Sequence, residues 1–152
     1  MKLLEIASLA LAIAILAGCA TTHTRTARAA DRLERRADAF AARSCYEPRD
    51  ACLASRYLSG ARGFADEARE FRRTIDGAGD QQVVLAYERL WRKYHTLRDE
   101  VCGLRDRQVQ GDLKPLKQAF VDVQRLVKNG YSYADPGLLA SGGYVLDPYY
   151  NE

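Results

Sequence analysis

The sequence has few of the residues that usually hold metals and prosthetic groups. Its only methionine is Met1, and its two histidines, His23 and His95, are far apart in the chain. Zinc sites need several cysteine or histidine ligands at close spacing, and covalent haem needs Cys-x-x-Cys-His, but no Cys-x-x-Cys pair occurs. A di-iron bundle needs Glu-x-x-His, whereas Arg92 stands three residues before His95. We therefore expect no metal and no cofactor.

Catalytic motifs are equally scarce. The chain has no nucleophile elbow, phosphate loop or dinucleotide fingerprint. Asp66, Glu67 and Glu70 are surrounded by arginines at positions 62, 69, 72 and 73, which is typical of a solvated, salt-bridged helix face. His95 is four residues before Asp99, a spacing that predicts a surface pair on a helix rather than a general base for one of the cysteines. We expect that the protein is not an enzyme.

Long apolar runs and a strong excess of one charge are also missing. The chain has 23 basic and 20 acidic residues, a net charge of +3, which is too mild to indicate a nucleic-acid partner. Its longest apolar run, residues 6–17, contains only Ile, Ala, Leu and one Ser. A membrane-spanning helix needs roughly 20 apolar residues, so this run instead suits the central segment of a signal peptide.

The run ends in Leu16-Ala17-Gly18-Cys19, which resembles the lipobox of bacterial lipoproteins. The resemblance implies that residues 1–18 are a signal peptide, that cleavage occurs before Cys19, and that Cys19 carries the acyl chains. Ala20 follows Cys19, whereas an Asp at that place favours inner-membrane retention in enteric lipoproteins. The resemblance thus implies an envelope protein in the outer membrane, facing the periplasm, that is anchored by lipid without spanning the bilayer.

Arginine is concentrated just after this site, at positions 25, 28, 32, 35 and 36. Of the 23 basic residues in the chain, 18 are arginine, so genomic base composition is one explanation of the row. The other is that the row rests on anionic lipid beside the anchor.

The rest of the chain predicts an all-α fold. Residues 19–26 are polar and without apolar period, and we expect them to form a tether. From about Ala27 apolar residues recur every three or four positions in four segments, near 27–44, 48–75, 80–110 and 112–129. Short loops between four amphipathic helices predict an antiparallel four-helix bundle over 27–130. The expected buried faces are Leu33, Ala37, Phe40, Ala41, Ser44, Leu53, Tyr57, Gly60, Phe64, Ala68, Phe71, Ile75, Val83, Val84, Tyr87, Leu90, Trp91, Tyr94, Leu97, Val101, Leu104, Leu116, Ala119, Phe120, Val123 and Val127.

Three signals set the expected ends of the last two helices. Asp80 follows a glycine-rich turn and can cap the third helix. Asp112 and Pro115 suit the start of the fourth helix. Asn129-Gly130 is a stop signal, with Gly130 able to adopt the left-handed conformation.

Folding the second and third helices about the turn near residue 78 pairs apolar positions throughout. The expected register places Phe71 opposite Val84, Phe64 opposite Trp91, and Cys52 almost level with Cys102. Because the periplasm is oxidising, we expect a Cys52–Cys102 disulfide. Cys45–Cys102 and Cys45–Cys52 are the alternatives.

Residues 131–152 have no period and are rich in Tyr, Gly and Pro, which predicts an irregular tail. Tyrosine offers a large contact area with a polar tip and is favoured at binding hot spots. The tail is therefore the candidate partner-binding surface, although packing against its own bundle or disorder are alternatives. The candidate tyrosines are Tyr131, Tyr133, Tyr144, Tyr149 and Tyr150.

Taken together, the sequence predicts a non-catalytic lipoprotein whose bundle binds a periplasmic or outer-membrane protein or a cell-wall component. In size, anchor, helix count and the Trp91, Tyr94, Leu97 and Cys102 arrangement it is similar to small helical secretion-system pilotins, which bind a secretin's terminal helix in a groove. A stress-response or immunity lipoprotein is another binding-type alternative. An envelope enzyme or small-ligand carrier is the alternative from a different class. An open apolar groove would favour the pilotin interpretation, and a polar cleft with carboxylates would favour an enzyme.

Overall fold

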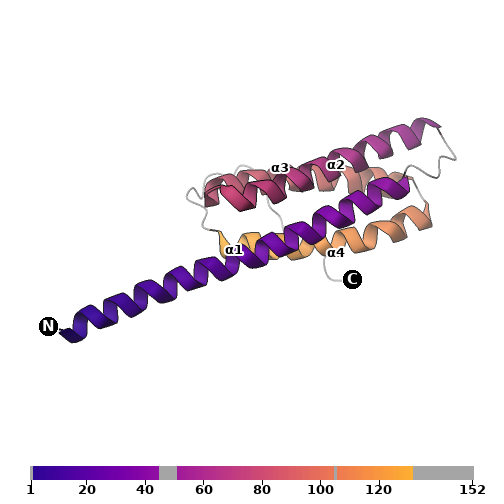
Figure 1. Ribbon diagram of the computed structural model, residues 1–152. Coiled ribbons are helices and arrows are strands. Elements are labelled where there is room, and N and C mark those ends of the chain that lie inside the picture. Colours follow the sequence, from indigo (N-terminus) through magenta and orange to yellow (C-terminus); the bar gives the residue numbers. More distant parts are fainter. Residues whose placement is uncertain (1, 45–50, 105, 132–152) are drawn as a thin grey trace.

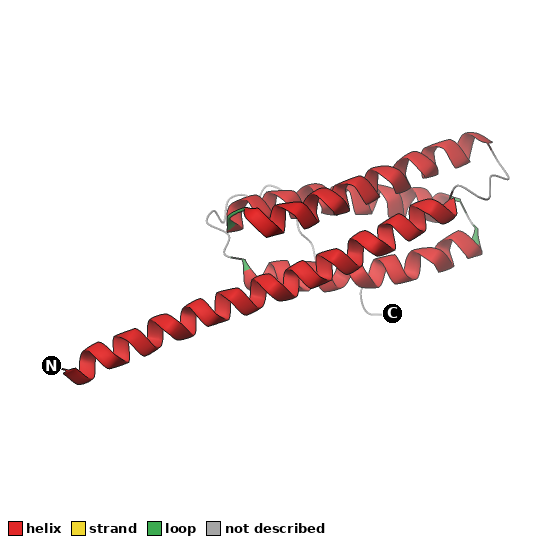
Figure 2. Ribbon diagram, viewed as in Figure 1, coloured by secondary structure: helices red, strands yellow, loops and turns green. Residues whose placement is uncertain are grey.

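The structure is a computed structural model that describes the backbone of residues 2–44, 51–104 and 106–131, and the side chains of residues 22–44, 57–104 and 106–131. These residues form four helices and no strand (Figures 1 and 2). The helices are α1 (Lys2–Ser44), α2 (Ala51–Gly77), α3 (Asp80–Gly103) and α4 (Arg107–Gly130).

The helices form an antiparallel bundle in which sequence neighbours are also neighbours in space. α1 packs between α2 and α4, and α2 packs on α3, so α1 lies diagonally opposite α3. The ion pairs Arg32–Asp122 and Arg43–Asp112 show that α1 and α4 run in opposite directions. The predicted all-α four-helix architecture is confirmed.

Aromatic side chains fill the centre of the bundle. Phe120 of α4 stacks on Tyr94 of α3, with ring centroids 4.1 Å apart, and also on Tyr87 at 6.2 Å. Phe64 of α2 meets both Tyr94 and Phe120 edge-on. Most residues of the predicted buried faces are buried, but Trp91, Ala41, Gly60 and Leu104 are only partly buried, and the side chain of Leu53 lies outside the described residues. The large rings between α3 and α4 fit with the looser packing of that helix pair.

The α2–α3 hairpin is present, but its aromatic contacts differ from the expected register. Phe71 meets Tyr87 rather than Val84, and Phe64 meets Tyr94 rather than Trp91. The shift is about one helical turn. Pairing by residue type could not detect it, because apolar residues recur at every turn of both helices.

The boundary between α3 and α4 was predicted several residues too late. α3 ends at Gly103, and Asp106 caps α4 by accepting hydrogen bonds from the backbone amides of Gln108 (2.8 Å) and Val109 (3.3 Å). Asp112 and Pro115 consequently lie inside α4. Pro115 is tolerated there because both it and Gly111, whose carbonyl loses its amide donor, are exposed to water.

The end of α4 shows why residue 130 is glycine. Its backbone is helical rather than left-handed, and α4 is capped by Tyr131 in an extended conformation. A Cβ added at Gly130 would overlap Cγ2 of Thr22 on α1. Gly130 therefore permits the close approach of α1 and α4, in place of the expected left-handed stop.

α1 begins well before the expected start at Ala27. It is continuous through residues 19–26, and Thr26 is fully buried, so the predicted tether is instead part of a helix that packs on the bundle. The Thr26 hydroxyl donates to the Thr22 carbonyl at 3.0 Å, which satisfies this polar group inside the helix. Figure 1 shows α1 projecting beyond the end of the bundle toward the N-terminus.

Candidate functional site

The predicted lipidation site, Cys19, lies on α1 at one end of the bundle. It precedes Thr22 by three residues, which is about 4.5 Å along a helix axis. Because Thr22 already meets the last turn of α4, the bundle begins within one turn of Cys19. The side chain of Cys19 lies outside those that the structure describes. None of the described helices is both long enough and apolar enough to cross a membrane.

The same end of the bundle is closed by Tyr131. This residue was predicted to be part of an exposed binding tail, but it is 5% exposed and packs in the core. Burial raises the pKa of the Tyr131 phenol, an effect that the nearby Thr26 hydroxyl opposes and the charge of Asp80 reinforces. Tyr131 is therefore a structural residue. The other candidate tyrosines, Tyr133, Tyr144, Tyr149 and Tyr150, lie outside the described residues.

The cysteine at the other end of α3 does not form the expected bridge. Cys102 is exposed and its thiol is free in the structure. Its neighbour Val101 is fully buried, so Cys102 lies on the outer side of α3. Cys45 and the side chain of Cys52 lie outside the described residues, so a Cys45–Cys52 pairing stays a prediction.

His95 lies in aromatic surroundings. Its ring is 4.0 Å from that of Trp91 and 5.7 Å from that of Tyr94. Asp99, its expected partner, accepts a hydrogen bond from Arg98 at 2.9 Å. Trp91 and His95 thus form a surface aromatic pair beside the core. Among the described side chains, no group of three or more His, Cys, Asp and Glu residues is placed to hold a metal.

Three surface grooves are lined by arginine. One of about 350 Å³ lies between α2 and α3, one of about 550 Å³ lies along α2, and one of about 300 Å³ lies between α1 and α4. None of the three contains more than one carboxylate, and none is a continuous apolar channel. These grooves therefore favour neither a carboxylate-based active site nor a helix-binding apolar groove.

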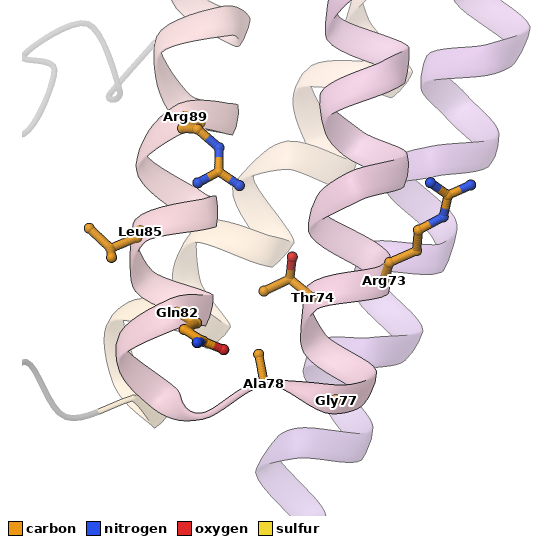
Figure 3. Close-up of a pocket in the computed structure, with 7 residues that line it drawn as sticks. All are labelled: Arg73, Thr74, Gly77, Ala78, Gln82, Leu85 and Arg89. Carbon is orange, nitrogen blue, oxygen red and sulfur yellow. The ribbon is translucent and has the colours of Figure 1, made fainter.

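The α2–α3 groove has arginines that already have acidic partners. It surrounds the turn at Gly77 and Ala78, and Figure 3 shows Leu85 projecting from α3 away from α2. Arg73 lies 3.6 Å from Glu70, and Arg89 lies 3.0 Å from Glu67. Leu85, at 39%, is a large hydrophobic residue left exposed near the bundle end.

The α1–α4 groove is the most basic of the three, with four arginines in its lining. Arg25, Arg28 and Arg32 follow one another at helical spacing on α1, and Arg125 faces them from α4. The sequence indicated the row on α1. It could not indicate Arg125, which joins that row only through the pairing of α1 with α4.

No protein-family model matches the chain, and no curated protein and no solved structure matches it.

Proposed function

We propose that the chain is a non-catalytic lipoprotein of the bacterial envelope, anchored through Cys19, whose helical bundle binds an envelope protein or a cell-wall component. The observation that carries the proposal is the motif Leu16-Ala17-Gly18-Cys19 after a short apolar run. The geometry adds that this motif ends where the bundle begins, because Thr22 packs against Gly130.

The position of Cys19 next to the bundle determines which end of the bundle would face the membrane. If cleavage occurs before Cys19, the mature chain begins one helical turn before the first packed residue. The bundle end formed by Thr22, Tyr131 and the turn at residues 77–80 then lies directly at the membrane surface. The remaining length of the bundle, about 35 Å for a 24-residue helix such as α4, extends away from the membrane.

The test is acyl labelling and membrane fractionation of Cys19→Ala in cells. We expect the variant to lose both the label and the membrane association, because two or more acyl chains make such an anchor stable. Cys102→Ala is the matched control, since Cys102 is an exposed free thiol whose loss should leave both properties unchanged. A Cys19→Ala variant that is still acylated and membrane-bound would refute the proposal.

A further inference from the structure

The groove between α1 and α4 concentrates positive charge that is only partly neutralised by the acidic side chains that the structure describes. It is lined by Arg25, Arg28, Arg32 and Arg125, with Asp122 as its single acidic residue. Asp122 lies 3.7 Å from Arg32 and accounts for one of the four charges. Arg25, Arg28 and Arg125 are exposed and form no ion pair with any residue that the structure describes. Three like charges around about 300 Å³ favour an anion in the groove.

Arginine also sets the kind of anion. Its planar guanidinium presents parallel donors that match the oxygens of a phosphate group, and two or three guanidiniums can share one phosphate. Leu126 and Ala29 in the same groove add apolar surface beside the charges. This combination suits a phosphate ester with an apolar part better than a free inorganic ion.

The location of the groove points to the source of the phosphate. Arg25 is six residues after Cys19 on the same helix, about 9 Å along its axis. Arg125 is five residues before Gly130, which packs beside Thr22, so it lies at a similar depth on α4. A chain anchored at Cys19 would hold all three unpaired arginines within reach of lipid headgroups.

We propose that the α1–α4 groove binds the phosphate headgroup of an anionic phospholipid and so fixes the orientation of the bundle on the membrane. The proposal rests on the anchor at Cys19 proposed above. Basic residues close to an anionic surface each add to membrane affinity, and the attraction weakens as salt rises. The arginines would act as a second contact beside the acyl chains.

The test measures vesicle binding without the lipid anchor, using the full chain with Cys19→Ala. Cosedimentation is compared between vesicles of phosphatidylcholine alone and vesicles with 30% phosphatidylglycerol. The groove variant is Arg25→Gln, Arg28→Gln and Arg125→Gln. The control variant is Arg92→Gln, Arg107→Gln and Lys114→Gln, which removes the same charge from exposed positions elsewhere.

We expect the parent chain to prefer the anionic vesicles, and the groove variant to lose at least about 10-fold of that affinity while the control loses less than about 3-fold. Binding to neutral vesicles reports the apolar N-terminal run and should be equal in all three. Equal losses in both variants, or no preference for anionic vesicles in the parent chain, would overturn the proposal. Competition by millimolar inorganic phosphate that abolishes the preference would also overturn it, because the site would then take free phosphate.

This assay does not depend on acylation. A chain whose Cys19 is never acylated in cells can still show the groove-dependent preference, and an acylated chain can lack it. Failure of the anchor and failure of the groove are therefore distinguishable.

Discussion

The α2–α3 groove and the α1–α4 groove are both lined by arginine, but they differ in whether acidic side chains lie beside the arginines. Between α2 and α3, Arg73 and Arg89 lie beside Glu70 and Glu67. Between α1 and α4, three arginines share a groove whose only carboxylate is already beside Arg32. The comparison shows that the abundance of arginine in this chain does not mark a site. The site proposed above is instead a groove in which three arginines lie together without a counter-charge among the described residues.

The arginines with partners explain much of the remaining surface. Arg69 of α2 reaches Asp38 of α1 at 2.9 Å and Asp66 of its own helix at 2.8 Å, and these carboxylates raise its pKa, with Asp66 contributing most. Such exposed pairs contribute little stability each. They neutralise many of the arginines on the helix surfaces, and in the α1–α4 groove three arginines without an acidic partner among the described residues lie together.

The largest change in stability should come from a substitution that pushes α1 and α4 apart, because the α1–α4 groove depends on their close packing. Gly130→Ala places a Cβ against Cγ2 of Thr22. Because Thr22 is β-branched, its side chain cannot easily rotate away from the new methyl group. We therefore expect the free energy of unfolding to fall by about 1–3 kcal/mol. Urea denaturation followed by circular dichroism measures it. Adding Thr22→Ser, which removes Cγ2, should restore most of the loss.

Gly111→Ala is the matched control on the same helix. A Cβ there meets nothing within 4 Å, so the change should be neutral or stabilise by up to about 1 kcal/mol. Equal stability changes for Gly130→Ala and Gly111→Ala would show that the α1–α4 contact is not as close as described.

A smaller effect should separate the two kinds of arginine. Arg89→Gln removes a cation that lies 3.0 Å from Glu67, and we expect it to lower the free energy of unfolding by up to about 1 kcal/mol. Arg125→Gln removes an arginine without an acidic partner among the described residues, and we expect no loss. Urea unfolding at low and high salt compares them, and the difference should shrink at high salt. A loss for Arg125→Gln as large as that for Arg89→Gln would remove the distinction between the grooves.

The smallest effect is a pH-dependent change in stability at the bundle end that contains Tyr131, next to the α1–α4 groove. Burial raises the pKa of Tyr131 above its ordinary value of 10.0, so the unfolded chain releases this proton first as the pH rises. The free energy of unfolding of the wild type minus that of Tyr131→Phe should be constant below about pH 10 and should fall above it. Unfolding of both proteins between pH 8 and 11 measures the difference. A difference that does not change with pH would mean that the phenol is not buried as described.

The sequence predicted most of the fold and little of the groove. Helical periodicity located four helices and most of their buried faces, because that pattern is local to each helix. Trp91 was the largest residue that this pattern wrongly placed in the core, since its neighbours Leu90 and Tyr94 already supply the core face of α3. Register, by contrast, depends on which turn of one helix meets which turn of another, and repeated apolar residues leave that choice open.

The errors at the bundle ends have a common cause. Thr22 and Thr26 have low helix propensity, but Thr22 packs against the end of α4 and Thr26 is fully buried, and such tertiary contacts favour the helix. Similarly, Pro115 looked like a helix start, whereas the carboxylate cap at Asp106 sets the true start. In both cases tertiary contacts or a cap prevailed over a local signal. The groove depends on the same α1–α4 pairing and could not be read from either helix alone.

The central claim is that the bundle end near Thr22 sits at the membrane surface with no tether between. Lipids with a nitroxide on the headgroup can test it, because they quench the fluorescence of a nearby tryptophan. The membrane-bound protein keeps Cys19, carries Trp91→Phe to remove its only native tryptophan, and receives one new tryptophan. Leu85→Trp reports the near end, about 8 Å from the start of α3, and Lys114→Trp reports a site about 24 Å from the end of α4. The account predicts strong quenching at position 85 and weak quenching at position 114. Equal quenching at both positions, or stronger quenching at 114, would contradict it.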